Sequence, residues 1–231
     1  MPISPDRILF EDQWLLIVAK LPGELTVAGK GRLDRLSLLD FLRQQFPTLL
    51  PVHRLDFETS GVLVFAKSKA VLKKILDTRF QGWMKTYVAL LLGPAKQKEG
   101  TVSIPLKARS SLGVVPAETK YKVLVSSPAA SLVEISFERG QRHQIRQHMA
   151  MIGWPLVLDD VYGNEKENRK FQRFLKMKRF FLHASVITFP HPMTGRPMSV
   201  TAPMPKSFEA TMKKLKMVGA KWTFESLRKV G

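Results

Sequence analysis

Residues 53–67 read HRLDFETSGVLVFAK, a dense polar turn that leads directly into an apolar segment. The part from Gly61 to Lys67 is short and rich in Val, Leu and Phe, which predicts a buried β-strand. Loops beside buried strands often carry binding and catalytic residues. The turn is therefore the first candidate for a functional site, although an ordinary capped turn would use the same polar residues.

The residue types in this turn allow three kinds of chemistry. His53 and Asp56 could hold a metal ion, Ser60 could act as a nucleophile, or Asp56 could act as a carboxylate nucleophile beside Arg54. The spacing alone does not choose among them. Because the chain contains no cysteine, disulfides, thiolate zinc sites and a thiol nucleophile are excluded.

Outward from this turn, short β-rich runs alternate with amphipathic ones. Strands are predicted at residues 8–20, 61–67, 85–93, 119–125, 131–138, 180–190 and 196–203. Helices are predicted at residues 37–46, 68–81, 143–153 and 207–217. Several strands follow one another with no helix between them, which favours an α+β fold with a mixed, mainly antiparallel central sheet and flanking helices.

The charge of the chain indicates its class of partner. Lys and Arg number 37 against 19 Asp and Glu, a net charge of +18, which favours a polyanion such as nucleic acid. A generally basic, solvated surface is the alternative. Seven basic residues gather between Lys166 and Arg179, and a second cluster occupies residues 206–231, where a basic terminal helix is expected. We find no secretory signal and no apolar run long enough to span a membrane, so we expect a cytosolic protein.

A second polar group, RGQRHQIRQHM, occupies residues 139–149 and is predicted to open a helix. Ile145 and Met149 would form the apolar side of that helix. Arg146 lies about 100° around from Ile145, at the margin of the core, where an arginine can hold a buried acid. The alternative is a surface arginine whose stem packs along the protein.

Five segments in order resemble the RluA-type family of RNA pseudouridine synthases. HRLDFETSG at 53–61 resembles the family signature HRLDxxTSG, and AKLPG at 19–23 resembles its NKPxG element. The other three are KTYVA at 85–89, GQRHQIRQHMAMIGWPLVLDDVYG at 140–163 and FLHASVITFPHPMTG at 181–195. The resemblance implies the pseudouridine synthase catalytic fold and an isomerase that converts uridine to pseudouridine in structured RNA.

The resemblance also implies a role for four residues. Asp56 matches the catalytic aspartate, and Arg54 matches the arginine that helps to expel the target uridine and fills the vacated space. Tyr87 matches the tyrosine that packs on the flipped base. Arg146 matches the arginine that pairs with the catalytic aspartate. We therefore expect Asp56 to be catalytic and Arg54, Tyr87 and Arg146 to bind substrate, with no metal and no cofactor.

The chain departs from the family pattern at Leu21, Gln141 and Leu158, which stand where proline, arginine and glycine are usual. Leu158 is expected to alter the turn that presents Asp159. We expect one catalytic domain over residues 1–231, with a core at about 8–205, a basic helix and tail at 206–231, and no N-terminal RNA-binding domain. The catalytic domain would then select its own target.

The expected protein is a monomer that acts on ribosomal or transfer RNA, with a slight preference for ribosomal RNA. The main rival is a non-catalytic RNA-binding or ribosome-assembly protein with the same fold, which would keep its RNA affinity after Asp56→Asn. A second rival is a metal-dependent hydrolase of nucleic acid, which would lose activity with a chelator.

Overall fold

The computed structural model describes residues 3–28, 36–108, 113–176 and 179–217. The chain forms two compact units, one of residues 1–85 with 184–203 and the other of residues 86–183 with 204–231. Two of the three boundaries fall inside strands, namely β5 (Met84–Leu92) and β11 (Leu182–Pro190), and the third lies between residues 203 and 204. The expectation of a single catalytic domain over the whole chain stays a prediction.

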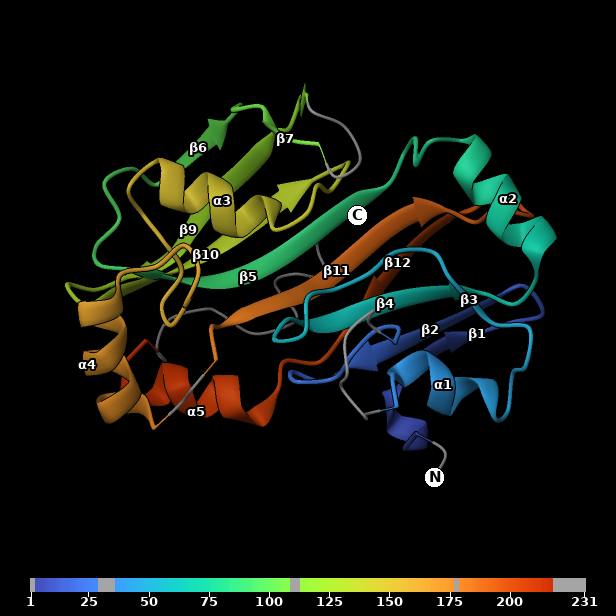
Figure 1. The fold of residues 1–231 in the computed structure, drawn as a ribbon, viewed down its shortest axis with the longest axis horizontal. Helices are drawn as coiled ribbons and strands as arrows, with labels where there is room; N and C mark the ends of the chain where they lie inside the picture. The colour runs from blue at the N-terminus through green and yellow to red at the C-terminus, as the bar shows by residue number, and fades with distance from the viewer. Residues whose placement is uncertain (1–2, 29–35, 109–112, 177–178, 218–231) are drawn as a thin grey trace. The chain divides into compact units, whose positions relative to one another are not determined.

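The first unit contains a mainly antiparallel sheet (Figure 1). Besides its parts of β5 and β11, its elements are η1 (Pro5–Arg7), β1 (Ile8–Glu11), β2 (Leu15–Lys20), α1 (Leu38–Arg43), β3 (Leu50–Pro51), β4 (Ser60–Ala66), α2 (Lys69–Asp77) and β12 (Pro197–Thr201). The strands follow the order β1-β2-β4-β11-β12, and β3 also pairs with β4. The pairs β1/β2, β2/β4, β3/β4 and β11/β12 are antiparallel.

Strands β2 and β4 form the centre of this unit and are buried along their whole length. Their core includes Ile17, Val64 and Trp83, and the Trp83 ring stacks on Phe189 with centroids 4.3 Å apart. Gly61 at the start of β4 has φ +118°, and a Cβ atom there would lie 2.1 Å from the Ala184 carbonyl oxygen on β11. Only glycine fits this position, because the neighbouring backbone occupies the space of a side chain.

The single strand predicted for residues 8–20 is wrong, because the chain turns back between Glu11 and Leu15 to form β1 and β2. The Asp12 carboxylate causes this turn, since its Oδ1 accepts hydrogen bonds from the backbone N–H groups of Trp14 (2.8 Å) and Leu15 (2.7 Å). Such bonds from an aspartate to its own following backbone compete with a continuous strand.

The second unit has a sheet of order β5-β10-β9-β6 and the remaining helices (Figure 1). Its further elements are β6 (Glu99–Val102), β7 (Leu106–Lys107), β8 (Val114–Val115), β9 (Thr119–Ser126), β10 (Ala130–Phe137), α3 (Gln144–Met151), α4 (Glu165–Leu175) and α5 (Lys206–Lys214). The pairs β9/β10, β6/β9 and β7/β8 are antiparallel. The predicted α+β class with a mainly antiparallel sheet is confirmed.

The four predicted helices appear as α1, α2, α3 and α5, each shorter than its predicted range. Ser68 caps α2 as expected, because its Oγ accepts a hydrogen bond from the Val71 backbone N–H. Helix α4 was not predicted. The expected tail beyond residue 217 lies outside the described residues. Among the helices of the described segments, none is long and apolar enough to cross a membrane.

Candidate active site

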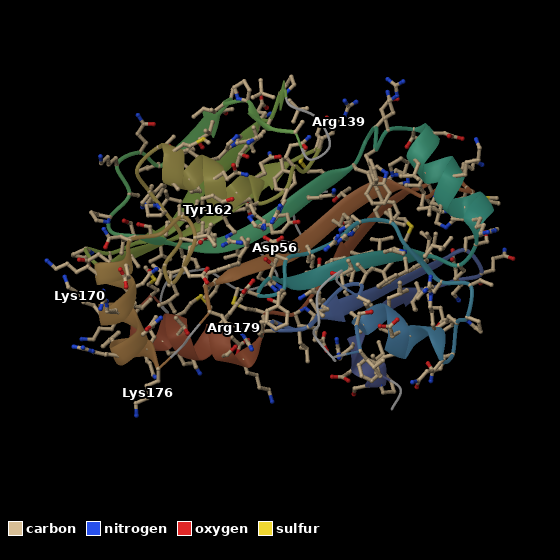
Figure 2. The ribbon with its side chains drawn as sticks, in the orientation of Figure 1. Asp56, Arg139, Tyr162, Lys170, Lys176 and Arg179 are labelled. Atoms are coloured by element: carbon tan, nitrogen blue, oxygen red, sulfur yellow. The ribbon has the colours of Figure 1, made fainter. Side chains whose placement is uncertain are left out.

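Asp56 lies in the loop between β3 and β4, half-buried, and Figure 2 shows it at the start of β4. Hydrogen bonds to backbone carbonyls hold the residues on both sides of Asp56. Thr26 Oγ1 donates to the Leu55 carbonyl (3.1 Å), and Gly23 N–H donates to the Phe57 carbonyl (2.8 Å). The AKLPG element and the residues after it therefore fix the loop that presents the Asp56 carboxylate.

Lys20, at the end of β2, is the central support of this loop. Its side chain is 1% exposed, and Nζ donates to the backbone carbonyls of Leu21 (3.1 Å), Phe57 (3.1 Å) and Thr59 (2.7 Å). Burial lowers the Lys20 pKa to about 8, although the nearby carboxylates of Glu24, Glu58 and Asp56 oppose this change. The ammonium ion thus binds loop carbonyls on either side of Glu58 and adds positive charge near Asp56.

His53 anchors the other end of the loop to β4. Its Nε2 accepts a hydrogen bond from the Val64 backbone N–H (3.2 Å), which assigns the ring proton to Nδ1. Burial, followed by the positive charge of Lys85, lowers the His53 pKa to about 3. His53 is therefore neutral near pH 7 and acts as a fixed acceptor for the backbone.

The structure distinguishes among the three kinds of chemistry that the sequence left open for this loop, namely a serine nucleophile, a metal site and a carboxylate nucleophile. Ser60 is fully buried, so its hydroxyl has no access to a polymeric substrate. His53 uses Nε2 to accept the β4 hydrogen bond, and within the described residues no three His, Asp or Glu side chains gather as metal ligands. Asp56 is a partly accessible carboxylate of the loop, as is Glu58, and Arg54 is exposed beside Asp56.

Tyr87 and Arg146 belong to the second unit. Tyr87 on β5 is 7% exposed, and its ring stacks on Phe137 of β10 with centroids 5.3 Å apart. Arg146 on α3 is 4% exposed, and its guanidinium lies over the rings of Tyr162 (5.2 Å) and Phe180 (4.5 Å). The sequence placed Arg146 at the core margin, whereas the structure buries it.

Arg146 forms a two-point ion pair with Asp159, through Nε (2.6 Å) and Nη2 (2.8 Å). Burial would raise the pKa of Asp159, but hydrogen bonds from Arg146 and from the Val161 and Tyr162 backbones outweigh it and lower that pKa. The pair is thus fully ionised near pH 7. The expected pairing of Arg146 with Asp56 joins residues of the two units and stays a prediction.

Asn168 of α4 holds the turn that presents Asp159. Its Oδ1 accepts from the Leu158 N–H (2.8 Å), and its Nδ2 donates to the Asp159 carbonyl (2.7 Å). Leu158 has φ +66°, the left-handed backbone that glycine adopts without strain, and its side chain is buried. The turn thus keeps a glycine-like conformation despite its leucine.

The sequence alone did not identify two supports of these sites, Lys20 and Asn168. Lys20 ends an otherwise apolar strand, and a lysine buried at that position needs polar partners, which was a usable signal. Asn168 carried no comparable signal, because its partners lie in the preceding loop and α4 itself was not predicted.

Residues 14–151 match the family model described as RNA pseudouridylate synthase. The protein belongs to this family. Among curated relatives of this pseudouridylate synthase, the ribosomal large subunit pseudouridine synthase C of Vibrio vulnificus (strain CMCP6) is 34% identical over 91% of the chain and 70% of that protein. The enzyme of the same name from Escherichia coli (strain K12) is also 34% identical, with the same coverage.

Solved structures agree on the fold of this pseudouridylate synthase. Human RNA Pseudouridylate Synthase Domain Containing 4 superposes with a TM-score of 0.74 at 24% identity, over 90% of this chain and 92% of that one. Human RNA Pseudouridylate Synthase Domain Containing 1 gives a TM-score of 0.71 at 24% identity, over 89% and 87%. The resemblance seen in the sequence is confirmed, and the enzyme is an isomerase that converts uridine in RNA to pseudouridine.

Proposed function

We propose that this enzyme isomerises one or a few uridines of large-subunit ribosomal RNA, with Asp56 as the catalytic carboxylate. The observation that carries the proposal is the support of the Asp56 loop, which Lys20, Thr26 and His53 fix while Asp56 itself stays partly accessible. The names of the two curated relatives, both large-subunit ribosomal RNA enzymes, favour ribosomal over transfer RNA.

The reaction is an isomerisation that needs no co-reactant. The bond between ribose C1′ and uracil N1 breaks, the uracil rotates, and C1′ bonds to C5, while the proton lost from C5 is balanced by one gained at N1. A carboxylate serves this sequence either by bonding to the sugar or base, or by taking a sugar proton. Asp56 would take one of these roles, in a loop whose backbone is held by hydrogen bonds.

The three substrate-binding residues would bring the uridine to Asp56. A stacked uridine must leave its helix before reaction, which costs a few kcal/mol. Exposed Arg54 would fill the vacated space in the stack, and Tyr87, whose ring is fixed by Phe137, would pack on the extruded uracil. Arg146, fixed by Asp159, would supply positive charge to the catalytic carboxylate or substrate.

The test is a pseudouridine map of total RNA from cells that lack the gene, with wild-type, Asp56→Asn or Glu58→Ala protein restored. Asp56→Asn keeps the side-chain shape and should lower the rate by about three orders of magnitude or more. Glu58→Ala removes a half-buried carboxylate of the same loop and should restore the sites. The proposal fails if Asp56→Asn restores them, or if the lost sites lie outside large-subunit ribosomal RNA.

A further inference from the structure

Helix α4 has two opposite faces that the sequence separates cleanly. Its inner face consists of Asn168, Phe171 and Leu175, which are buried. Its outer face, here called the α4 basic face, consists of Lys166, Arg169, Lys170 and Arg173, all exposed. These four residues are spaced three, four and seven positions from the first, so they form one stripe along the helix.

Repulsion among the positive charges of this stripe destabilises helix α4 when it is considered alone. Like charges three or four residues apart repel one another, and every such pair within the α4 basic face is positive with positive. Arg169 contacts Glu165 (2.9 Å) and Lys170 contacts Glu167 (2.8 Å), but these ion pairs are exposed to water and bind weakly. The positive potential of the face therefore persists, and a polyanion would relieve its repulsion.

The positive surface continues from α4 onto α5. Lys214 of α5 donates from Nζ to the carbonyl of Leu175, the last residue of α4 (3.2 Å). Phe208 of α5 is buried and stacks on Phe181, with centroids 3.9 Å apart, which fixes α5 in the second unit. Lys176 follows α4 and is exposed, and α5 and the residues after it carry further exposed lysines, namely Lys206, Lys213 and Lys216, while α5 also carries an exposed acid, Glu209. Figure 2 shows Lys170 and Lys176 directed outward from α4.

Helix α2 is also basic but differs in arrangement. Lys69 and Lys73 share one stripe with Asp77, so this shorter stripe ends in an acid, which Lys73 contacts at 2.7 Å. Lys74 lies on another side of the helix. Helix α2 therefore offers a matched control with three exposed lysines that do not form a continuous positive stripe.

We propose that the α4 basic face, extended by α5, binds the phosphate backbone of the RNA substrate. This inference rests on the proposed function for the nature of the substrate. The phosphates of RNA match a continuous stripe of positive charge, and contacts of this kind position a protein without reading sequence. Because they bind without reacting, these residues act on affinity and leave the chemical step unchanged.

The first experiment measures binding of a fluorescent 24-base-pair RNA duplex by anisotropy over a range of KCl concentrations. The test protein carries Lys166→Gln, Lys170→Gln and Arg173→Gln, and the control carries Lys69→Gln, Lys73→Gln and Lys74→Gln. The test variant should bind about tenfold or more weaker at 0.1 M salt, and the slope of log Kd against log [KCl] should fall by about 2 to 3. The control should change Kd less than about twofold.

The second experiment measures pseudouridine formation in the RNA that the pseudouridine map identifies. The α4 variant should raise KM about tenfold at an unchanged kcat, with a melting temperature equal to that of the wild type. Equal weakening of duplex binding in both variants, or a lower kcat at constant KM, would overturn the inference. The duplex assay requires no catalysis, so a failure of the proposed function at Asp56 would leave its result interpretable.

Discussion

Acidification from pH 7 to pH 5 should lower the free energy of unfolding through His53, which anchors the Asp56 loop to β4. The His53 pKa is about 3 in the folded protein, against an ordinary value of 6.5. A histidine whose pKa is depressed on folding stabilises the folded state above pH 6.5, and this contribution is lost as the pH falls toward 3. Protonation of Nε2 would also break the hydrogen bond from Val64.

The size of the effect follows from the two pKa values. Between pH 7 and pH 5 the unfolded chain takes up most of a proton at this position, whereas the folded chain takes up almost none. The free energy of unfolding should therefore fall by about 2 kcal/mol. This is an upper value, since His53 is only half-buried and solvent partly screens its charge.

The assay is urea unfolding at pH 7 and pH 5, for the wild type and for His53→Gln. Glutamine keeps an acceptor for the Val64 N–H but does not titrate. Burial also lowers the pKa of His148, so the wild type should lose more stability than His53 alone explains, and the difference between the two proteins isolates His53. The same loss between pH 7 and pH 5 in both proteins would refute the reasoning.

Three further predictions concern the backbone and its supports. Gly61→Ala should lower the free energy of unfolding, measured in urea, by more than about 4 kcal/mol, because the new Cβ would meet the Ala184 carbonyl. Gly93→Ala, with open space around its Cβ, should lower it by about 1 to 2 kcal/mol. Equal losses in the two variants would contradict this reasoning. Asn168→Leu should lower kcat about tenfold with little change in KM, since it releases the turn that holds the buried ion pair, and an unchanged kcat would argue against a positioning role. Lys20→Met should lower the free energy of unfolding by about 2 kcal/mol, as three carbonyls lose an ammonium donor, and wild-type stability would show that these bonds contribute nothing.

The fold was predictable where the apolar pattern is strong. Strand β4 is buried at every position, and the helix containing Ile145 and Met149 appears as α3. Helix α4 escaped prediction because the side chains of its inner face are few and one of them is the polar Asn168. Charged side chains fill most other positions of the segment, so the sequence shows no clear repeat of apolar residues at helical spacing. The turn at Asp12 was missed for a related reason, since one aspartate divided an otherwise continuous apolar run.

The candidate site was predictable in composition but not in its supports. The motif placed Asp56 and Arg54 in a loop before a buried strand, as the structure has them. The hydrogen bonds from Lys20 to Phe57 and Thr59 join residues 37 and 39 positions apart, and such contacts depend on how β2 and β4 pair. Within its unit Arg146 pairs with Asp159, which follows a left-handed residue, Leu158. A leucine in the sequence gives no sign of that backbone conformation.

Hydrogen exchange at the Leu158 amide can also measure how often α4 opens. The Leu158 amide bonds to a side chain of α4, and Leu158 is buried, so its proton can exchange with solvent only when α4 moves away from the turn. That one amide therefore reports the local opening free energy of the helix whose outer face carries the positive stripe. A polyanion that binds the α4 basic face and stabilises α4 would slow this exchange without contacting the turn.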